Sequence, residues 1–273
     1  MSSQPPQTLS IRMATPDIDA LIEQCRTGDG DARYQAILAL GRAGDPRAID
    51  AILPSLRDPD VDLRSAAVTA LGEIGAARTD EVGAAIELLL LDPDWLVRSE
   101  AAEALGTLGY ALARPALEQV LRSDPHATPR ASAAETLGDL GDRRALEALV
   151  LALADDDGPV RSYAALAIGL LGDPAGLTSL RQRLQTESRP GTRKSLLVAA
   201  TRLGDSRALD ELVAMADQAD EESVYQFQAA MSDLVAEKTP TIVMARAEEL
   251  SRRLTALGDD ELAARLDALS TIT

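Results

Sequence analysis

The chain has 273 residues, a formal net charge of −17, 46% hydrophobic residues and only 2% aromatic residues. Its single cysteine, Cys25, and single histidine, His126, exclude intramolecular disulfides, Cys/His zinc sites and most catalytic triads. A chain this acidic repels nucleic acid phosphates and anionic lipid heads, and no apolar run reaches the length of a membrane helix. We therefore expect a cytoplasmic protein with no nucleic-acid partner, no membrane partner and no cofactor.

Residues 1–14 contain Ser, Gln and Pro with little periodicity, which predicts a disordered tail. They also lack the basic start and the apolar stretch of a secretory signal. Thr15 and Pro16 then predict the start of a helix, one face of which is apolar and includes Cys25. We expect this helix to be half a repeat that caps the N-terminal end, with Cys25 as a small buried group and not a reactive thiol.

A motif of about 32 residues then recurs six times, and each copy has an arginine followed eleven residues later by a glycine. The arginines are Arg33, Arg64, Arg98, Arg130, Arg161 and Arg193, at spacings of 31, 34, 32, 31 and 32 residues. The glycines are Gly44, Gly75, Gly109, Gly141, Gly172 and Gly204. A fixed period of this kind predicts a repeat architecture, in which each unit packs on its neighbours.

Each copy predicts a pair of helices. The first begins near the arginine and has small or apolar residues three, four, six and seven places later, as at Ala101, Ala102, Ala104 and Leu105. Two glycines stand near the end of this helix, such as Gly106 and Gly109, and the second of them is expected to end the helix in a left-handed conformation. A short turn leads to the second helix, which has its own apolar spacing. We expect the second helices to line the concave surface of the stack.

An acidic residue stands six positions before each of these arginines except Arg33. We expect these acids to accept backbone N–H groups at the helix starts and to pair with arginines of their own and the next repeat. The result would be a ladder that holds the stacking register, a structural role that we favour over a catalytic one. The predicted ladder residues are Asp58, Arg64, Asp92, Arg98, Asp124, Arg130, Asp155, Arg161, Glu187 and Arg193.

The unit D-P-D-x-x-V-R-x-x-A-A-x-A-L-G-x-L-G, present at positions 92–109, resembles the HEAT-like repeats first associated with phycobilisome bilin lyases. The resemblance covers approximately residues 15–217. It implies an all-α fold, a right-handed α-solenoid of about six HEAT-like helical hairpins over residues 15–218, with atypical capping helices at both ends. Proteins of this family include E/F-type bilin lyase subunits, phycobilisome-degradation factors and binding proteins, and its relatives include DNA alkylpurine glycosylases.

The repeat pattern decays in residues 219–273, although helical spacing continues at Ser223–Val235 and after Pro240. Terminal repeats are commonly atypical because one of their faces meets water. We expect this segment to cap the same solenoid, with a dimerisation or docking segment as the alternative.

Several second helices have apolar residues at positions expected to face outward, which predicts a partner surface unless helix rotation buries them. Trp95 opens the third copy in a loop, where it is a candidate hot spot, although packing onto the neighbouring loop is the favoured alternative. His126 is expected to be an exposed loop residue. The predicted partner-binding residues are Leu88, Leu89, Trp95, Glu147, Leu151, Arg183 and Met215.

The sequence contains no nucleotide-binding loop, no G-x-S-x-G elbow and no H-E-x-x-H pair. The favoured hypothesis is a non-catalytic scaffold that binds a protein with a basic or mixed-charge surface on the concave face. The alternative, implied by the resemblance, is a bilin lyase-like subunit acting with a partner, in which Arg183 or Arg114 would bind tetrapyrrole propionates. Nucleic-acid binding is a third hypothesis, which the charge disfavours. The oligomeric state stays open.

Overall fold

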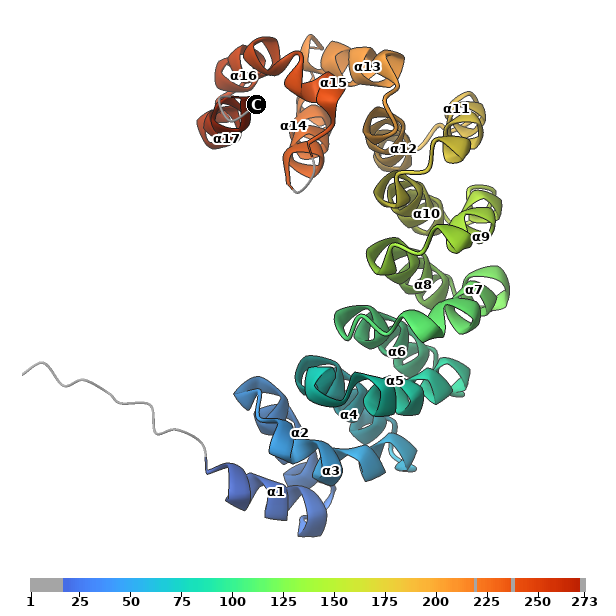
Figure 1. The fold of residues 1–273 in the computed structure, drawn as a ribbon, viewed down its shortest axis with the longest axis vertical. Helices are drawn as coiled ribbons and strands as arrows, with labels where there is room; N and C mark the ends of the chain where they lie inside the picture. The colour runs from blue at the N-terminus through green and yellow to red at the C-terminus, as the bar shows by residue number, and fades with distance from the viewer. Residues whose placement is uncertain (1–16, 219, 237–238, 271–273) are drawn as a thin grey trace, which may run out of the picture.

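The computed structural model describes residues 17–218, 220–236 and 239–270, and within them the chain is helical and contains no β-strand (Figure 1). The fold is an all-α, right-handed α-solenoid with HEAT-like hairpins, as the sequence predicts. The predicted tail, residues 1–14, lies outside the described residues. None of the described helices combines the length and the hydropathy that crossing a membrane requires.

Six helical hairpins form the centre of the solenoid. Their first helices are α2 (Gly30–Ala43), α4 (Val61–Ile74), α6 (Trp95–Thr107), α8 (Ala127–Leu140), α10 (Gly158–Leu171) and α12 (Pro190–Arg202). Their second helices are α3 (Ile49–Ile52), α5 (Thr79–Glu87), α7 (Arg114–Ser123), α9 (Leu146–Ala152), α11 (Leu177–Leu184) and α13 (Ser206–Ala216). Short 3-10 helices adjoin the second helices: η1 (Pro46–Ala48), η2 (Leu53–Arg57), η3 (Gly75–Arg78), η4 (Leu88–Leu91), η5 (Ala111–Ala113), η6 (Arg143–Ala145) and η7 (Pro174–Gly176).

Further helices cover the two ends of this stack. Helix α1 (Ile18–Thr27) packs on α2 at the N-terminal end. The C-terminal end consists of α14 (Glu221–Val235), α15 (Thr241–Met244), α16 (Ala247–Ala256) and α17 (Asp260–Ser270). Arg253 of α16 pairs with Asp217, the residue that follows α13, and Arg246 just before α16 bonds to Asp210 of α13 at 2.6 Å. These contacts attach the C-terminal helices to the last regular hairpin.

Glycines with a positive φ end five of the six first helices, because the left-handed conformation stops the helix at little steric cost to a residue without Cβ. They are Gly44, Gly109, Gly141, Gly172 and Gly204. The same prediction is wrong for Gly75, whose φ is −74°, because the chain continues there directly into η3. A Cβ on Gly75 would come within 2.7 Å of Val82 Cγ1, so this position needs glycine for close packing.

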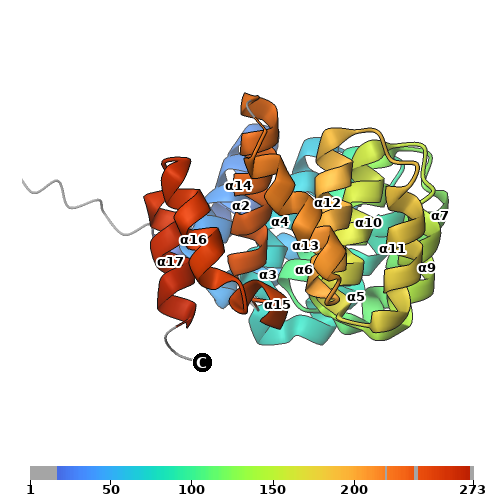
Figure 2. The same ribbon diagram turned by 90° about the horizontal axis from the view of Figure 1, so that it is seen from above.

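The first helices line the inner side of the curved stack and the second helices form its outer layer (Figures 1 and 2). The prediction that the second helices line the concave face is therefore wrong. The reason is the small residues of the first helices: a Cβ on Gly138 would lie 2.8 Å from Ala167 Cα, and one on Gly169 would lie 2.9 Å from Ala199 Cα. Neighbouring first helices thus pack backbone to backbone, whereas neighbouring second helices scarcely touch. The stack bends toward its more compact side.

One continuous core of alanine, leucine, isoleucine and valine runs from Cys25 to Leu266. Cys25 is 2% exposed and its thiol donates to the carbonyl of Ala51 at 3.4 Å, so it is the small buried group that the sequence predicts. Among the described residues, Phe227 of α14 is the largest side chain that is fully buried. The core therefore extends into the C-terminal helices, although the repeat motif has ended there.

Candidate interaction surfaces

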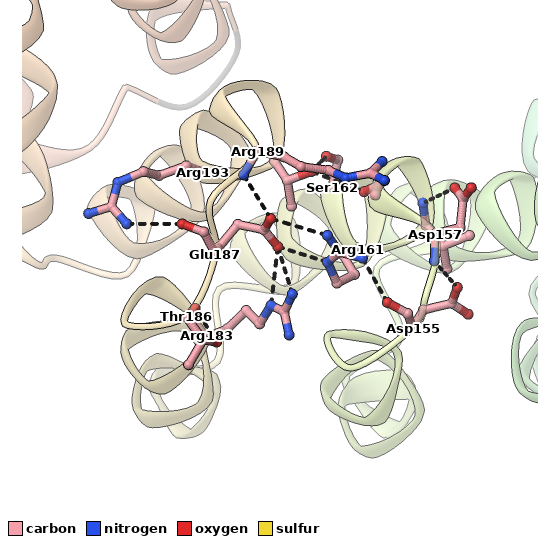
Figure 3. A network of polar contacts seen from close by, with 12 residues as sticks. Asp155, Asp157, Arg161, Ser162, Arg183, Thr186, Glu187, Arg189 and Arg193 are labelled. Atoms are coloured by element: carbon pink, nitrogen blue, oxygen red, sulfur yellow. Dashed lines mark hydrogen bonds and ion pairs between the residues drawn. The ribbon is translucent and has the colours of Figure 1, made fainter.

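Four of the ladder arginines, Arg64, Arg98, Arg130 and Arg161, each hold an acid of the next inter-repeat loop with two nitrogens, as Figure 3 shows for Arg161. The Nε of Arg161 donates to Glu187 Oε2 at 2.8 Å, and Nη2 donates to Oε1 at 3.1 Å. The third nitrogen, Nη1, donates to the carbonyl of Asp155 at 2.8 Å. Glu187 also accepts from Arg183 Nη2 at 2.9 Å and from the backbone N–H of Arg189 at 3.1 Å. One arginine thus ties its own loop to the next.

The same pairing repeats along the stack. The shortest nitrogen–oxygen distances are 2.8 Å for Arg33–Asp58, 2.8 Å for Arg64–Asp92, 2.6 Å for Arg98–Asp124 and 2.8 Å for Arg130–Asp155. Arg193 departs from the series, because it pairs with Glu211 of its own second helix. The structure therefore brings all ten predicted ladder residues into one line of contacts, which ends at the last regular hairpin.

Burial and pairing have opposite effects on the ladder acids. Burial alone would raise the pKa of Glu187, but hydrogen bonds from Arg161, Arg183 and the N–H of Arg189 outweigh it and lower the pKa to about 2. The pKa of Asp124 is lowered in the same way by Arg98 and by the N–H of His126. Glu187 and Asp124 are therefore ionised at neutral pH and held by the arginines of the ladder, which supports a role in setting the stacking register.

The predicted partner-binding residues lie on the outer layer or at its edge, and they differ in exposure. Leu88 and Leu151 are 62% and 60% exposed, and Glu147 is exposed beside Leu151 on α9. Leu89 and Met215 are half-buried and pack against the core, so helix rotation covers much of them. Of the apolar candidates on the second helices, only Leu88 and Leu151 present a large open surface.

Arg183 and Arg114, the candidate propionate ligands, are both engaged within the chain. Arg183 bonds to Glu187 of the ladder. Arg114 pairs with Glu118 on its own helix, and its Nε lies 3.2 Å from Asp142 Oδ2. An external carboxylate would have to compete with these internal acids.

Trp95 stacks on His126 of the neighbouring loop, with the ring centroids 5.8 Å apart and the planes at 15°. Packing onto the next loop was the favoured alternative for this side chain. Trp95 nevertheless stays 39% exposed, next to Leu91, which is 83% exposed and which the sequence had not singled out. We call Leu88, Leu91 and Trp95, together with Leu151 two hairpins further along on α9, the outer patch. Beside it, a hollow of about 180 Å³ between α7 and α9 has Leu151 and Arg122 in its lining.

The inner side of the first helices bears acids that the sequence had not indicated as a surface. Glu73, Glu100 and Glu103 share a hollow of about 260 Å³ between α4 and α6. Burial raises the pKa of Glu135 on α8, and the nearby Asp139 and Glu103 raise it further. These five acids, here called the acidic strip, thus run as neighbours across three helices. The sequence shows these acids as polar residues of the first helices. Only the direction of curvature shows that the first helices, and the acids with them, lie on the inner side.

The inner side also contains a groove of about 950 Å³ at the C-terminal ends of α8, α10, α12 and α14. Its lining includes Asp139 and Leu166, together with Leu170, which is 40% exposed. Arg202 and Asp233 form its other side. We call this feature the inner groove. Among the residues that the structure describes, no three His, Cys, Asp or Glu side chains are grouped to hold a metal ion.

Comparisons with known proteins agree on the architecture. A profile of HEAT repeats matches residues 18–82, 82–162 and 146–232, which is most of the chain. The structure is similar to the complex of CpcE and CpcF of phycocyanin lyase from Nostoc sp. PCC7120, at 23% identity and a TM-score of 0.55. That match covers 91% of this chain and 100% of the other. It is also similar to an engineered protein at 18% identity and a TM-score of 0.51, covering 69% and 96% of the two chains.

A search among curated proteins gives no match. At these identities the structural similarities establish the fold alone, and they agree with the HEAT-like resemblance inferred from the repeated motif. Because the HEAT profile covers well over half of the sequence, the chain belongs to the family of HEAT-repeat proteins.

Proposed function

We propose that the protein is a non-catalytic scaffold that binds a partner protein through the outer patch. The observation that carries this proposal is the exposure of Leu88, Leu91 and Leu151, which are 62%, 83% and 60% accessible to solvent. Fully burying a leucine contributes roughly 1.5–3 kcal/mol, so a partner that covers these side chains gains several kcal/mol. On this proposal the residues that bind the partner belong to the outer layer, whereas the sequence analysis expected them on the concave face.

The outer patch has the composition of a protein-binding site. It includes Trp95, which is 39% exposed, and tryptophan is enriched among residues that dominate binding energy. The ladder beneath Trp95 holds its loop in place through Asp92 and Asp124, so little ordering is needed on binding. An acidic chain of this kind favours a partner with basic groups around an apolar centre.

The test compares a Leu88→Glu/Leu151→Glu variant with a matched Gln119→Glu/Thr178→Glu variant. Both add two charges to exposed positions of the outer layer, but only the first removes apolar surface. Each immobilised protein is used to capture partners from lysate of the native host, with quantitative mass spectrometry and circular dichroism to verify folding. We expect a partner held by wild type and the matched variant but lost by the leucine variant. Equal capture by both variants would refute the outer patch as the site.

A second candidate function is a subunit of a bilin lyase that acts with a partner chain. The observation in its favour is the similarity to the CpcE–CpcF complex, which spans 91% of this chain. Mixing the protein with a free bilin at micromolar concentration and recording the visible spectrum tests it. A shift of the absorption band supports this candidate, and an unchanged spectrum counts heavily against it.

A further inference from the structure

The inner groove adjoins the place where the close packing of first helices ends, between α12 and α14. Along the stack, glycines such as Gly138 and Gly169 let the next helix approach to backbone contact. Thr201 occupies the equivalent position in α12, where it is fully buried. α12 and α14 contact each other less extensively than the earlier pairs of first helices do. Arg202 of α12 and Asp233 of α14 line the groove at this looser junction.

The groove combines an apolar wall with groups of negative potential. Leu166 and Leu170 of α10 form the apolar wall, and Leu170 is 40% exposed. The carbonyl ends of α8 and α10 meet the groove at Gly141 and Gly172, and helix C-termini carry partial negative charge. Asp139 lines the same groove.

The two arginines of the groove are directed to the chain itself. Arg143 Nε donates to the carbonyl of Leu171 at 3.3 Å, and Arg202 Nη2 donates to the carbonyl of Asp233 at 2.5 Å. They offset part of the negative potential of these helix ends. Because both guanidinium groups bond to backbone carbonyls, neither is used to cover the apolar wall at Leu166 and Leu170.

The acidic strip continues from the groove along the inner side, with Asp139 belonging to both. Within α4, α6, α8 and α10 the only basic residues are the ladder arginines, which are engaged in the ladder. Glu73, Glu100, Glu103 and Glu135 therefore have no basic side chain of these four helices between them. Burial raises the pKa of Glu100, a hydrogen bond from Ser65 offsets part of this, and Glu103 raises the pKa further. A cation placed along the strip would relieve this repulsion.

We propose that the inner side binds a basic amphipathic helix of a partner protein. Its apolar residues would pack on Leu166 and Leu170 in the inner groove, and its lysines or arginines would lie along the acidic strip. Helix-in-groove binding of this kind combines apolar anchors with charge complementarity at the rim. This surface is separate from the outer patch, so the failure of one proposal would leave the other unaffected.

The test uses a fluorescein-labelled helical peptide of leucine and lysine, about 18 residues long, which as a helix spans roughly 27 Å. A peptide with glutamate in place of lysine is the charge control. Binding is measured by fluorescence anisotropy in about 0.15 M salt, where surface attraction is screened beyond roughly 8 Å. We expect the lysine peptide to bind and the glutamate peptide to bind at least about ten-fold more weakly.

The decisive variant is Leu170→Asp, compared with Thr178→Asp on the outer layer. Leu170→Asp removes the apolar anchor but adds a negative charge, so groove binding predicts about ten-fold weaker binding, whereas unspecific attraction predicts equal or tighter binding. Leu170→Gln gives a second variant without a new charge, and it should also weaken binding. Thr178→Asp should leave the affinity unchanged.

Undiminished binding to both Leu170 variants, with their folding verified by circular dichroism, would overturn the proposal. So would equal affinity for the glutamate peptide. The Leu88→Glu/Leu151→Glu variant should bind the lysine peptide like wild type, and loss of binding there would show that the peptide occupies the outer patch instead.

Discussion

Replacing Arg98 by alanine tests whether the ladder stabilises the stack. The Arg98 residue is 8% exposed, and its side chain holds both oxygens of Asp124, at 2.6 and 2.9 Å. It also donates to the carbonyl of Asp92 at 2.8 Å. The variant leaves the carboxylate of Asp124 almost buried, with the N–H of His126 still donating to it. Breaking such a pair by removing one member typically destabilises a protein by about 3–5 kcal/mol.

The assay is urea unfolding followed by far-ultraviolet circular dichroism. With a slope of roughly 2–3 kcal/mol per molar urea, a loss of about 4 kcal/mol lowers the midpoint by about 1.3–2 M. The control is Arg47→Ala, because Arg47 pairs with Asp45 and Asp19 at the surface, where an ion pair contributes about 1 kcal/mol or less.

A second variant separates the orphaned charge from the lost contacts. Arg98→Ala/Asp124→Asn removes the buried charge but keeps an acceptor for the N–H of His126, so it should recover part of the lost stability. The reasoning is refuted if Arg98→Ala lowers the midpoint no more than Arg47→Ala does.

Three further predictions concern single residues. Because the folded-state pKa of Glu187 is about 2, below its ordinary value of 4.5, its stabilising contribution is present above pH 4.5 and lost as the pH falls toward 2. Glu187→Gln should therefore flatten the acid dependence of the urea midpoint, and an unchanged slope would contradict this. Burial raises the pKa of Glu100, so Glu100→Gln should raise the midpoint at pH 7, an advantage that disappears by about pH 4 as the carboxyl of wild type becomes protonated. Gly169→Ala should destabilise by about 1–3 kcal/mol because its Cβ meets the Ala199 backbone, whereas Gly191→Ala, with open space around it, should be neutral or stabilising. Equal unfolding midpoints for these two glycine variants would count against close packing as the origin of the curvature.

Local sequence rules account for most of the elements. The arginine-to-glycine frame predicted the helical hairpins, and the positive φ at Gly141 and Gly172 follows from the need to end a helix next to a turn. The burial of Cys25 followed from its place on an apolar helix face. Gly75 has the same local pattern but a different role, because the side chains of Val82 and Leu108 leave no room for a Cβ at this position.

The candidate site was predicted less well. Leu88 and Leu151 were selected correctly as apolar side chains that do not enter the core, whereas Leu89 and Met215 pack against it. A small rotation of a short helix about its axis decides between these outcomes, and helical spacing alone does not determine that rotation. Leu91 was missed because it lies in η4, where the 3-10 geometry shifts the apolar side chains away from α-helical spacing.

The sequence by itself determined the repeat, the hairpins and the residues of the ladder, because a period near 32 residues places equivalent side chains at equivalent positions in each unit. The tertiary structure alone decided the direction of curvature, because that depends on which layer packs more closely across the repeat boundary. The glycine and alanine contacts of the first helices made that layer the inner one. The same difference in packing places the second helices, with their exposed leucines, in the outer layer and the first helices, with the acidic strip, on the inner side.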